Sequence, residues 1–80
     1  MNEYEVYIEE INPCGGSQHS KKSIIEIEAV SPEVYVKENG RFPIMEMTKS
    51  ANGDDVIITG DGNGYYIRYT FSEWKIYVER

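Results

Sequence analysis

The sequence predicts an α+β fold, in which an antiparallel sheet of five or six strands carries one short helix on one face. Three observations lead to this prediction. Most of the chain consists of short segments in which apolar and polar residues alternate, as in half-buried strands. Turn-forming segments rich in Asn and Gly separate these stretches. Residues 31–40 instead carry the start and stop signals of a helix.

The first part of the chain contains two expected strands. Residues 4–9 alternate, which places Tyr4, Val6 and Ile8 on one face and Glu5, Tyr7 and Glu9 on the other. Residues 12–20 are rich in Gly and Ser and predict a loop. Residues 23–29 alternate again, with Ile25, Ile27 and Ala29 facing opposite to Ile24, Glu26 and Glu28. Each strand therefore has one face suited to a core and one suited to water.

The segment that follows predicts a helix over residues 32–39. Ser31 is a good N-cap, because its hydroxyl accepts a free backbone N–H of the first turn. Pro32 falls at the first helical position, where its missing N–H costs nothing. Gly40 is expected to take the left-handed conformation that often ends a helix. A helix of about two turns is not stable alone, so it must dock on the sheet.

A hairpin is the alternative for the same segment. Val34 to Val36 is a β-prone run, and Asn39-Gly40 is a favoured hairpin turn. The chain would then be an all-β meander. The agreement of several independent end signals favours the helix.

The second part of the chain predicts an antiparallel meander, because short turns join sequential strands. The expected strands are residues 44–49, 56–59, 65–71 and 74–78. The expected turns are residues 51–54, residues 60–64 and a tight turn at Ser72-Glu73. The order of elements is therefore ββαββββ. The expected core faces of the last two strands are Tyr65, Ile67, Tyr69 and Phe71, then Trp74, Ile76 and Val78, with Trp74 as an anchor.

The length and charge of the chain limit its possible functions. Its 80 residues predict one domain, residues 1–80. Fourteen acidic residues against eight basic ones give a net charge of −6. This charge argues against a nucleic-acid backbone and against an anionic membrane surface as partners. It permits a protein with a basic surface.

The single cysteine, Cys14, excludes an internal disulfide, which small secreted domains usually contain. The acidic N-terminus has no signal-peptide pattern, and no apolar run approaches the roughly 20 residues of a membrane span. The expected location is therefore the cytoplasm.

Catalytic and metal-binding patterns are weak. Cys14 and His19 share one loop, but no third group orients them, and a structural zinc site normally needs four ligands. Asp61 and Asn63 lack the remaining ligands of a calcium loop. Asp54-Asp55 is typical of a turn. We therefore expect no enzyme and no cofactor.

The acidic side of the first hairpin is the surface feature that points to a function. If residues 4–9 and 23–29 pair, the candidate site consists of Glu5, Tyr7, Glu9, Glu26 and Glu28 on one face. Glu3 and Glu10 extend the negative field. Like charges that face each other across strands are destabilising, so local stability alone does not favour this arrangement.

The sequence leaves the biological process open and supports three classes of function. The first is a small non-catalytic module that binds a basic protein through its acidic face. The second is a homo-oligomerising structural unit that associates through an exposed sheet edge; we expect the chain to be a monomer or a weak dimer. The third is a protein that binds a small ligand or metal through the loop of residues 12–20.

Overall fold

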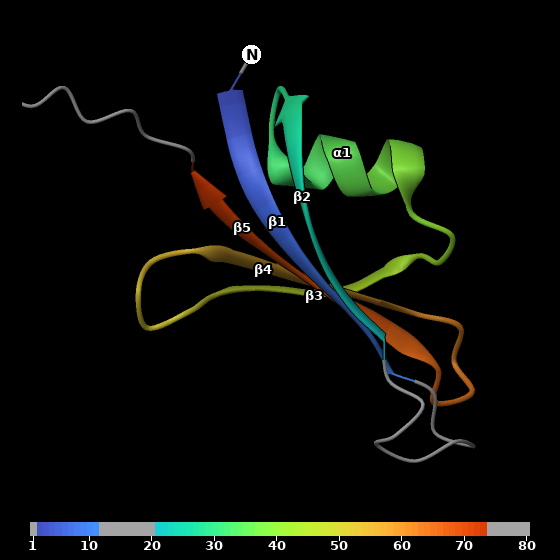
Figure 1. The fold of residues 1–80 in the computed structure, drawn as a ribbon. Helices are drawn as coiled ribbons and strands as arrows, with labels where there is room; N and C mark the ends of the chain where they lie inside the picture. The colour runs from blue at the N-terminus through green and yellow to red at the C-terminus, as the bar shows by residue number, and fades with distance from the viewer. Residues whose placement is uncertain (1, 12–20, 74–80) are drawn as a thin grey trace, which may run out of the picture.

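The computed structural model describes residues 2–11 and 21–73, which form one antiparallel sheet and one helix (Figure 1). The elements in chain order are β1 (Asn2–Ile11), β2 (Lys21–Ala29), α1 (Pro32–Asn39), β3 (Ile44–Lys49), β4 (Asp55–Gly60) and β5 (Tyr66–Glu73). This arrangement confirms the predicted α+β fold. The expected loop of residues 12–20 and the expected strand of residues 74–78, with Trp74, lie outside the described residues.

The five strands have the spatial order β2-β1-β5-β4-β3, and every neighbouring pair is antiparallel. β3, β4 and β5 form the predicted meander. β5 also pairs with β1, where Val6 lies opposite Phe71. β1 and β4 pair with the two edges of β5.

The predicted tight turn at Ser72-Glu73 is wrong. β5 continues through both residues, with Ser72 opposite Glu5 and Glu73 opposite Tyr4. The cause is the pairing of β5 with β1, which the sequence did not predict. The edge of β1 at Tyr4 and Glu5 offers hydrogen-bonding groups that extend the ladder of β5 through Ser72 and Glu73.

The core lies on one face of the sheet and under the helix. Its buried apolar residues are Tyr4, Val6, Ala29, Val36, Ile57, Ile67, Tyr69 and Phe71. Phe71 is at the centre, with ring centroids 5.7 Å from Tyr4, 6.0 Å from Tyr35 and 6.3 Å from Tyr69. Residues predicted to face the core on β1, β2 and β5 do so, which confirms the alternation.

The helix has the predicted bounds, so the alternative hairpin does not form. The Ser31 hydroxyl accepts a hydrogen bond from the Val34 N–H at 3.3 Å, and Pro32 occupies the first turn. α1 contacts both β2 and β4, and its Val36 side chain is 1% exposed. Figure 1 shows α1 on one side of the sheet, which it crosses near β2.

Gly40 does not adopt the predicted left-handed conformation, since its φ is −78° and its ψ is 148°. Its N–H donates to the Val36 carbonyl at 2.7 Å. A Cβ at this position would lie 2.6 Å from the same carbonyl oxygen. Glycine is therefore required by close backbone approach and not by a positive φ.

Replacing Gly40 with alanine should therefore destabilise the fold. We expect Gly40→Ala to lower the free energy of unfolding by about 1–3 kcal/mol, the usual cost of forcing an extra methyl group into a packed site. Urea denaturation measures the change. Glu38→Ala, at an exposed position of the same helix, serves as the control and should stay within about 0.5 kcal/mol of wild type. Equal stability of the two variants would contradict the close approach.

Candidate functional site

Four glutamates lie together on the outer face of the first hairpin, the face away from the helix. The β1–β2 register places Glu5 opposite Glu26 and Glu3 opposite Glu28. All four side chains are exposed. Residues that face each other in an antiparallel pair have Cβ atoms about 4.5–5.5 Å apart. We call Glu3, Glu5, Glu26 and Glu28 the acidic patch.

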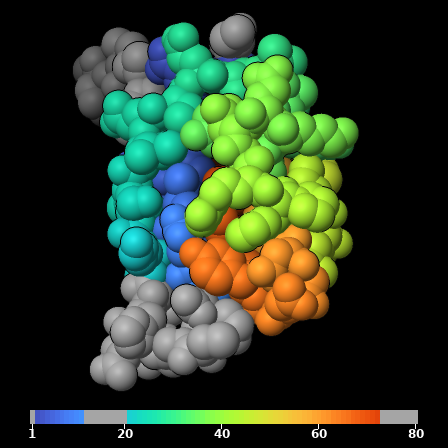
Figure 2. All heavy atoms as spheres, turned by 90° about the vertical axis from the view of Figure 1, so that its right-hand side faces the viewer, coloured from blue at the N-terminus to red at the C-terminus, as the bar shows by residue number. Residues whose placement is uncertain are grey.

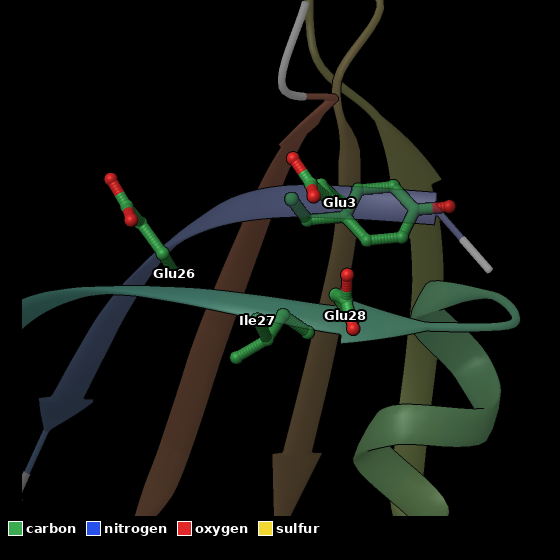
Figure 3. A pocket seen from close by; sticks show the side chains of 5 residues that line it. Glu3, Glu26, Ile27 and Glu28 are labelled. Atoms are coloured by element: carbon green, nitrogen blue, oxygen red, sulfur yellow. The ribbon is translucent and has the colours of Figure 1, made fainter.

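A shallow hollow of about 330 Å³ opens at the acidic patch. Its lining consists of Glu3, Tyr4, Glu26, Ile27 and Glu28. Figure 3 shows Glu3 on β1 across from Glu28 on β2, and shows Glu26 and Ile27 leaving β2 on opposite sides. The hollow therefore combines carboxylates from the outer face with an aromatic and an aliphatic side chain from the inner face.

An apolar row borders the acidic patch along the strands. The β1–β2 register places Tyr7 opposite Ile24. Tyr7 is partly buried, whereas Ile24 is 63% exposed. The candidate residues Glu5, Tyr7, Glu26 and Glu28 thus form one continuous surface, which Glu3 completes.

Glu9 belongs to a different environment. It lies four residues beyond Glu5, about 13 Å along the strand, opposite Lys22 on β2 and Arg68 on β5. The Arg68 Nε donates to Glu9 Oε1 at 2.7 Å, and the Glu9 side chain is only 13% exposed. The hydrogen bond and the charge of Arg68 hold the pKa of Glu9 below its ordinary value. Its charge is therefore neutralised within the sheet.

Glu10 also has its own partners, on the helix side of the sheet. It accepts hydrogen bonds from the Tyr65 hydroxyl at 3.0 Å and from the Arg41 guanidinium at 3.2 Å. The Arg41 guanidinium lies 5.4 Å from the Phe42 ring centroid and 5.8 Å from that of Tyr65. These contacts fasten the connection between α1 and β3 to the sheet. Among the described residues, none of the four glutamates of the acidic patch forms such an ion pair.

A second hollow, of about 460 Å³, lies near the other end of the outer face, beside the β4–β5 turn. Its lining is Met45, Glu46, Ile58, Gly62, Gly64, Tyr65, Tyr66 and Arg68. β3 shifts register between Ile44 and Glu46, and the Met45 sulfur lies where a Cβ on Gly60 would be. Arg68, the cation of this hollow, already binds Glu9. The sequence does not predict this hollow, because the hollow depends on the register shift of β3.

The weaker candidates have local structural roles. Asp61 accepts the Asn63 N–H at 2.7 Å within its own turn, and Asp55 pairs with Lys49 at 2.7 Å. Residues 2–11 and 21–73 contain no group of three or more side chains placed to hold a metal ion. Cys14 and His19 lie outside the described residues. In the same ranges, no helix has the length and apolar character needed to cross a membrane.

Comparison of the chain with protein-family models, with curated proteins and with solved structures finds no match.

The sequence predicts Glu3 only as an extension of the negative field, and the structure places it within the patch, opposite Glu28. One feature of the site could not be predicted. Arg68 is the counter-charge of Glu9, although the two residues are 59 positions apart. No local pattern reveals such a pair, since it requires knowledge that β1 lies beside β5.

Reversing one charge of the acidic patch should stabilise the fold. We expect Glu5→Lys to raise the free energy of unfolding by about 0.2–1 kcal/mol, because it turns a repulsive cross-strand pair with Glu26 into an attractive one. Thermal or urea denaturation at low ionic strength measures the gain. Glu38→Lys is the control. It makes the same change of charge on the helix, where the residue has no cross-strand partner. If Glu5→Lys gains no more than this control, the pair is not repulsive.

The Glu9–Arg68 pair should make stability depend on acid pH. The pKa of Glu9 is lowered by folding, so the pair stabilises the fold fully above the unfolded pKa of about 4.3. This contribution is lost as pH falls through the lower folded pKa. We expect Glu9→Gln to cost about 1 kcal/mol near neutral pH and less at pH values below the folded pKa.

The measurement is a series of urea denaturations across the acid range. Glu46→Gln is the control, because Glu46 is exposed on the same outer face and in none of the ion pairs of the described residues. A loss from Glu9→Gln that is the same at every pH would contradict the assigned role.

Proposed function

We propose that the protein is a non-catalytic binding module whose acidic patch docks on a basic surface of another protein. The observation that carries this proposal is the pair of like-charge contacts in the hairpin, Glu5 opposite Glu26 and Glu3 opposite Glu28. The proposed patch differs from the candidate site predicted from the sequence at two glutamates. Glu9 is left out because it has a structural role, and Glu3 is added.

The energetics of the acidic patch favour an external cation. Each repulsive cross-strand pair costs up to about 1 kcal/mol. Several other acids of the described residues have a basic partner, as in Glu9–Arg68, Glu10–Arg41 and Glu33–Lys37. The chain therefore has basic residues that can pair with acids. Among the described residues, none of them forms an ion pair with the acidic patch. A basic partner would offset the repulsion that the isolated hairpin carries.

The hollow suggests the chemistry of that partner. Its carboxylates suit a guanidinium, which binds carboxylates through two parallel hydrogen bonds. Tyr4 and Ile27 provide apolar surface for the stem of a long basic side chain. Tyr7 and Ile24 provide further apolar surface on the outer face, beside the acids. We infer an arginine- or lysine-rich protein surface and disfavour nucleic acid, whose phosphates the net charge of −6 repels.

Two other expectations stay predictions. Binding of a small ligand or metal through residues 12–20 concerns residues that the structure does not describe. The cytoplasmic location is inferred from the single cysteine and stays a prediction. Association through a sheet edge is favoured by a separate observation, developed below.

The docking proposal is tested with a double reversal on β1, Glu3→Lys with Glu5→Lys. Affinity capture from the source cell at low salt would identify partners of the wild type, and binding constants would then be measured for both proteins. We expect the double reversal to weaken binding at least about tenfold. The wild-type affinity should fall as salt rises, since salt screens exposed charges. NMR titration should show the first amide shifts at residues 3–5 and 26–28.

The matched control is a double reversal at Glu38 and Glu46, which changes the net charge equally outside the acidic patch. This control should bind like the wild type. Equal binding by both double reversals, or equal loss in both, would mean that only net charge matters and that the patch is a solvated surface.

A further inference from the structure

The outer edge of β2 is a free sheet edge as far as the described residues extend. β2 is the first strand in the spatial order, so β1 pairs with one of its edges only. Figure 2 shows β2 in teal and cyan along the margin of the molecule. An edge of this kind presents a row of backbone N–H and C=O groups that another strand can pair with. β2 is also nine residues long.

The side chains on the outer face of β2 form a self-complementary series. Lys22, Ile24 and Glu26 follow one another at two-residue spacing on this face. Ile24 stands between the two charges and is 63% exposed. If the strand is laid antiparallel against a copy of itself with Ile24 at the centre, each lysine faces a glutamate and the two isoleucines face each other.

We propose that two copies of this chain associate through antiparallel pairing of their β2 strands, with the two-fold axis at Ile24. Residues 21–27 of each copy then face residues 27–21 of the other. Lys22 of each copy lies opposite Glu26 of the other, on the outer face. The result is a continuous sheet of ten strands, formed from two sheets of five.

The outer-face side chains favour this register and this orientation over the neighbouring ones. An axis at Ser23 places Lys22 opposite Ile24 and leaves it without an acid. An axis at Ile25 also places each Lys22 opposite an acid, Glu28, but it sets both copies of Glu26 against Ile24. Parallel pairing in register sets like charges side by side, which is disfavoured. The axis at Ile24 alone among these places an ion pair on each side of a central apolar contact on the outer face.

A second copy also supplies what Glu26 lacks within its own sheet. Glu26 faces Glu5 on β1, so one of its neighbours is repulsive. In the proposed pairing its other neighbour is Lys22 of the second copy. The opposite edge of the sheet is less suitable, since β3 has six residues and a register shift between Ile44 and Glu46, and such irregularities discourage edge pairing.

Self-association is tested by measuring the molar mass of the full chain by sedimentation equilibrium at low salt. The monomer mass is 9.2 kDa. We expect the average mass to approach twice this value as the concentration rises from about 1 µM to about 1 mM, the range in which weak complexes form. A monomer at every concentration would overturn the proposal.

Two single charge reversals test the register. Lys22→Glu places glutamate opposite glutamate at both contacts, and Glu26→Lys places lysine opposite lysine. We expect each variant alone to associate at least about tenfold more weakly than wild type. An equimolar mixture of the two variants should associate again, since both contacts between unlike chains are then attractive. Failure of the mixture to associate, with both variants folded by circular dichroism, would overturn the register.

Two further variants separate this interface from a general effect of charge. Ile24→Lys places two like charges at the axis and should also weaken association, while Ile24 is exposed enough for the fold to tolerate the change. Glu28→Lys alters the net charge as Glu26→Lys does but lies outside the seven paired residues, and it should associate at least as well as wild type. Loss with Glu28→Lys equal to that with Glu26→Lys would contradict the axis at Ile24. The docking test uses substitutions on β1, so the two proposals can fail independently.

Discussion

The antiparallel pairing of β1 with β5 is the interaction on which the rest of the structure depends. It joins the β1–β2 hairpin to the β3–β4–β5 meander, and it brings Val6 opposite Phe71 in the centre of the core. α1 contacts β2 and β4, which lie on opposite sides of this pair, so the helix has a complete docking surface only once the pair exists. A two-turn helix needs that surface to persist.

Within residues 2–11 and 21–73, one short helix covers one face of the five-stranded sheet and no element covers the other face. The inner face concentrates its apolar side chains around Phe71, where four aromatic rings meet. The charges of the outer face are arranged differently at the two ends of β1. Near the C-terminal end of β1, Glu9 lies between the basic residues Lys22 and Arg68. Near its N-terminal end, the glutamates of β1 face glutamates of β2. Glutamate therefore has two roles on the outer face. At one end it forms an ion pair that stabilises the sheet, and at the other end it leaves an excess of negative charge.

Local signals explain which parts of this arrangement could be predicted. The cap at Ser31 and the proline after it act within one turn, so the helix bounds followed from the sequence. Alternation fixed the faces of β1 and β2, and thus the acids at Glu5, Glu26 and Glu28. The pairing between distant strands could not be predicted, because neither the Glu9–Arg68 contact nor the extension of β5 through Ser72 produces a local sequence pattern. Gly40 was assigned the wrong reason for being glycine, since left-handed geometry and close approach both exclude a Cβ.

The β1–β5 pairing also sets the order of events in folding. Its contacts close long loops, such as the one of 59 positions between Glu9 and Arg68, and closing such a loop costs roughly 3–4 kcal/mol in chain entropy before any contact offsets it. We expect the hairpin and the meander, whose contacts are local, to form first. We expect their joining to be the slow step, as in other proteins dominated by distant strand pairs. During synthesis β1 leaves the ribosome before β5, so one edge of β1 stays unpaired until nearly the whole sheet has been made.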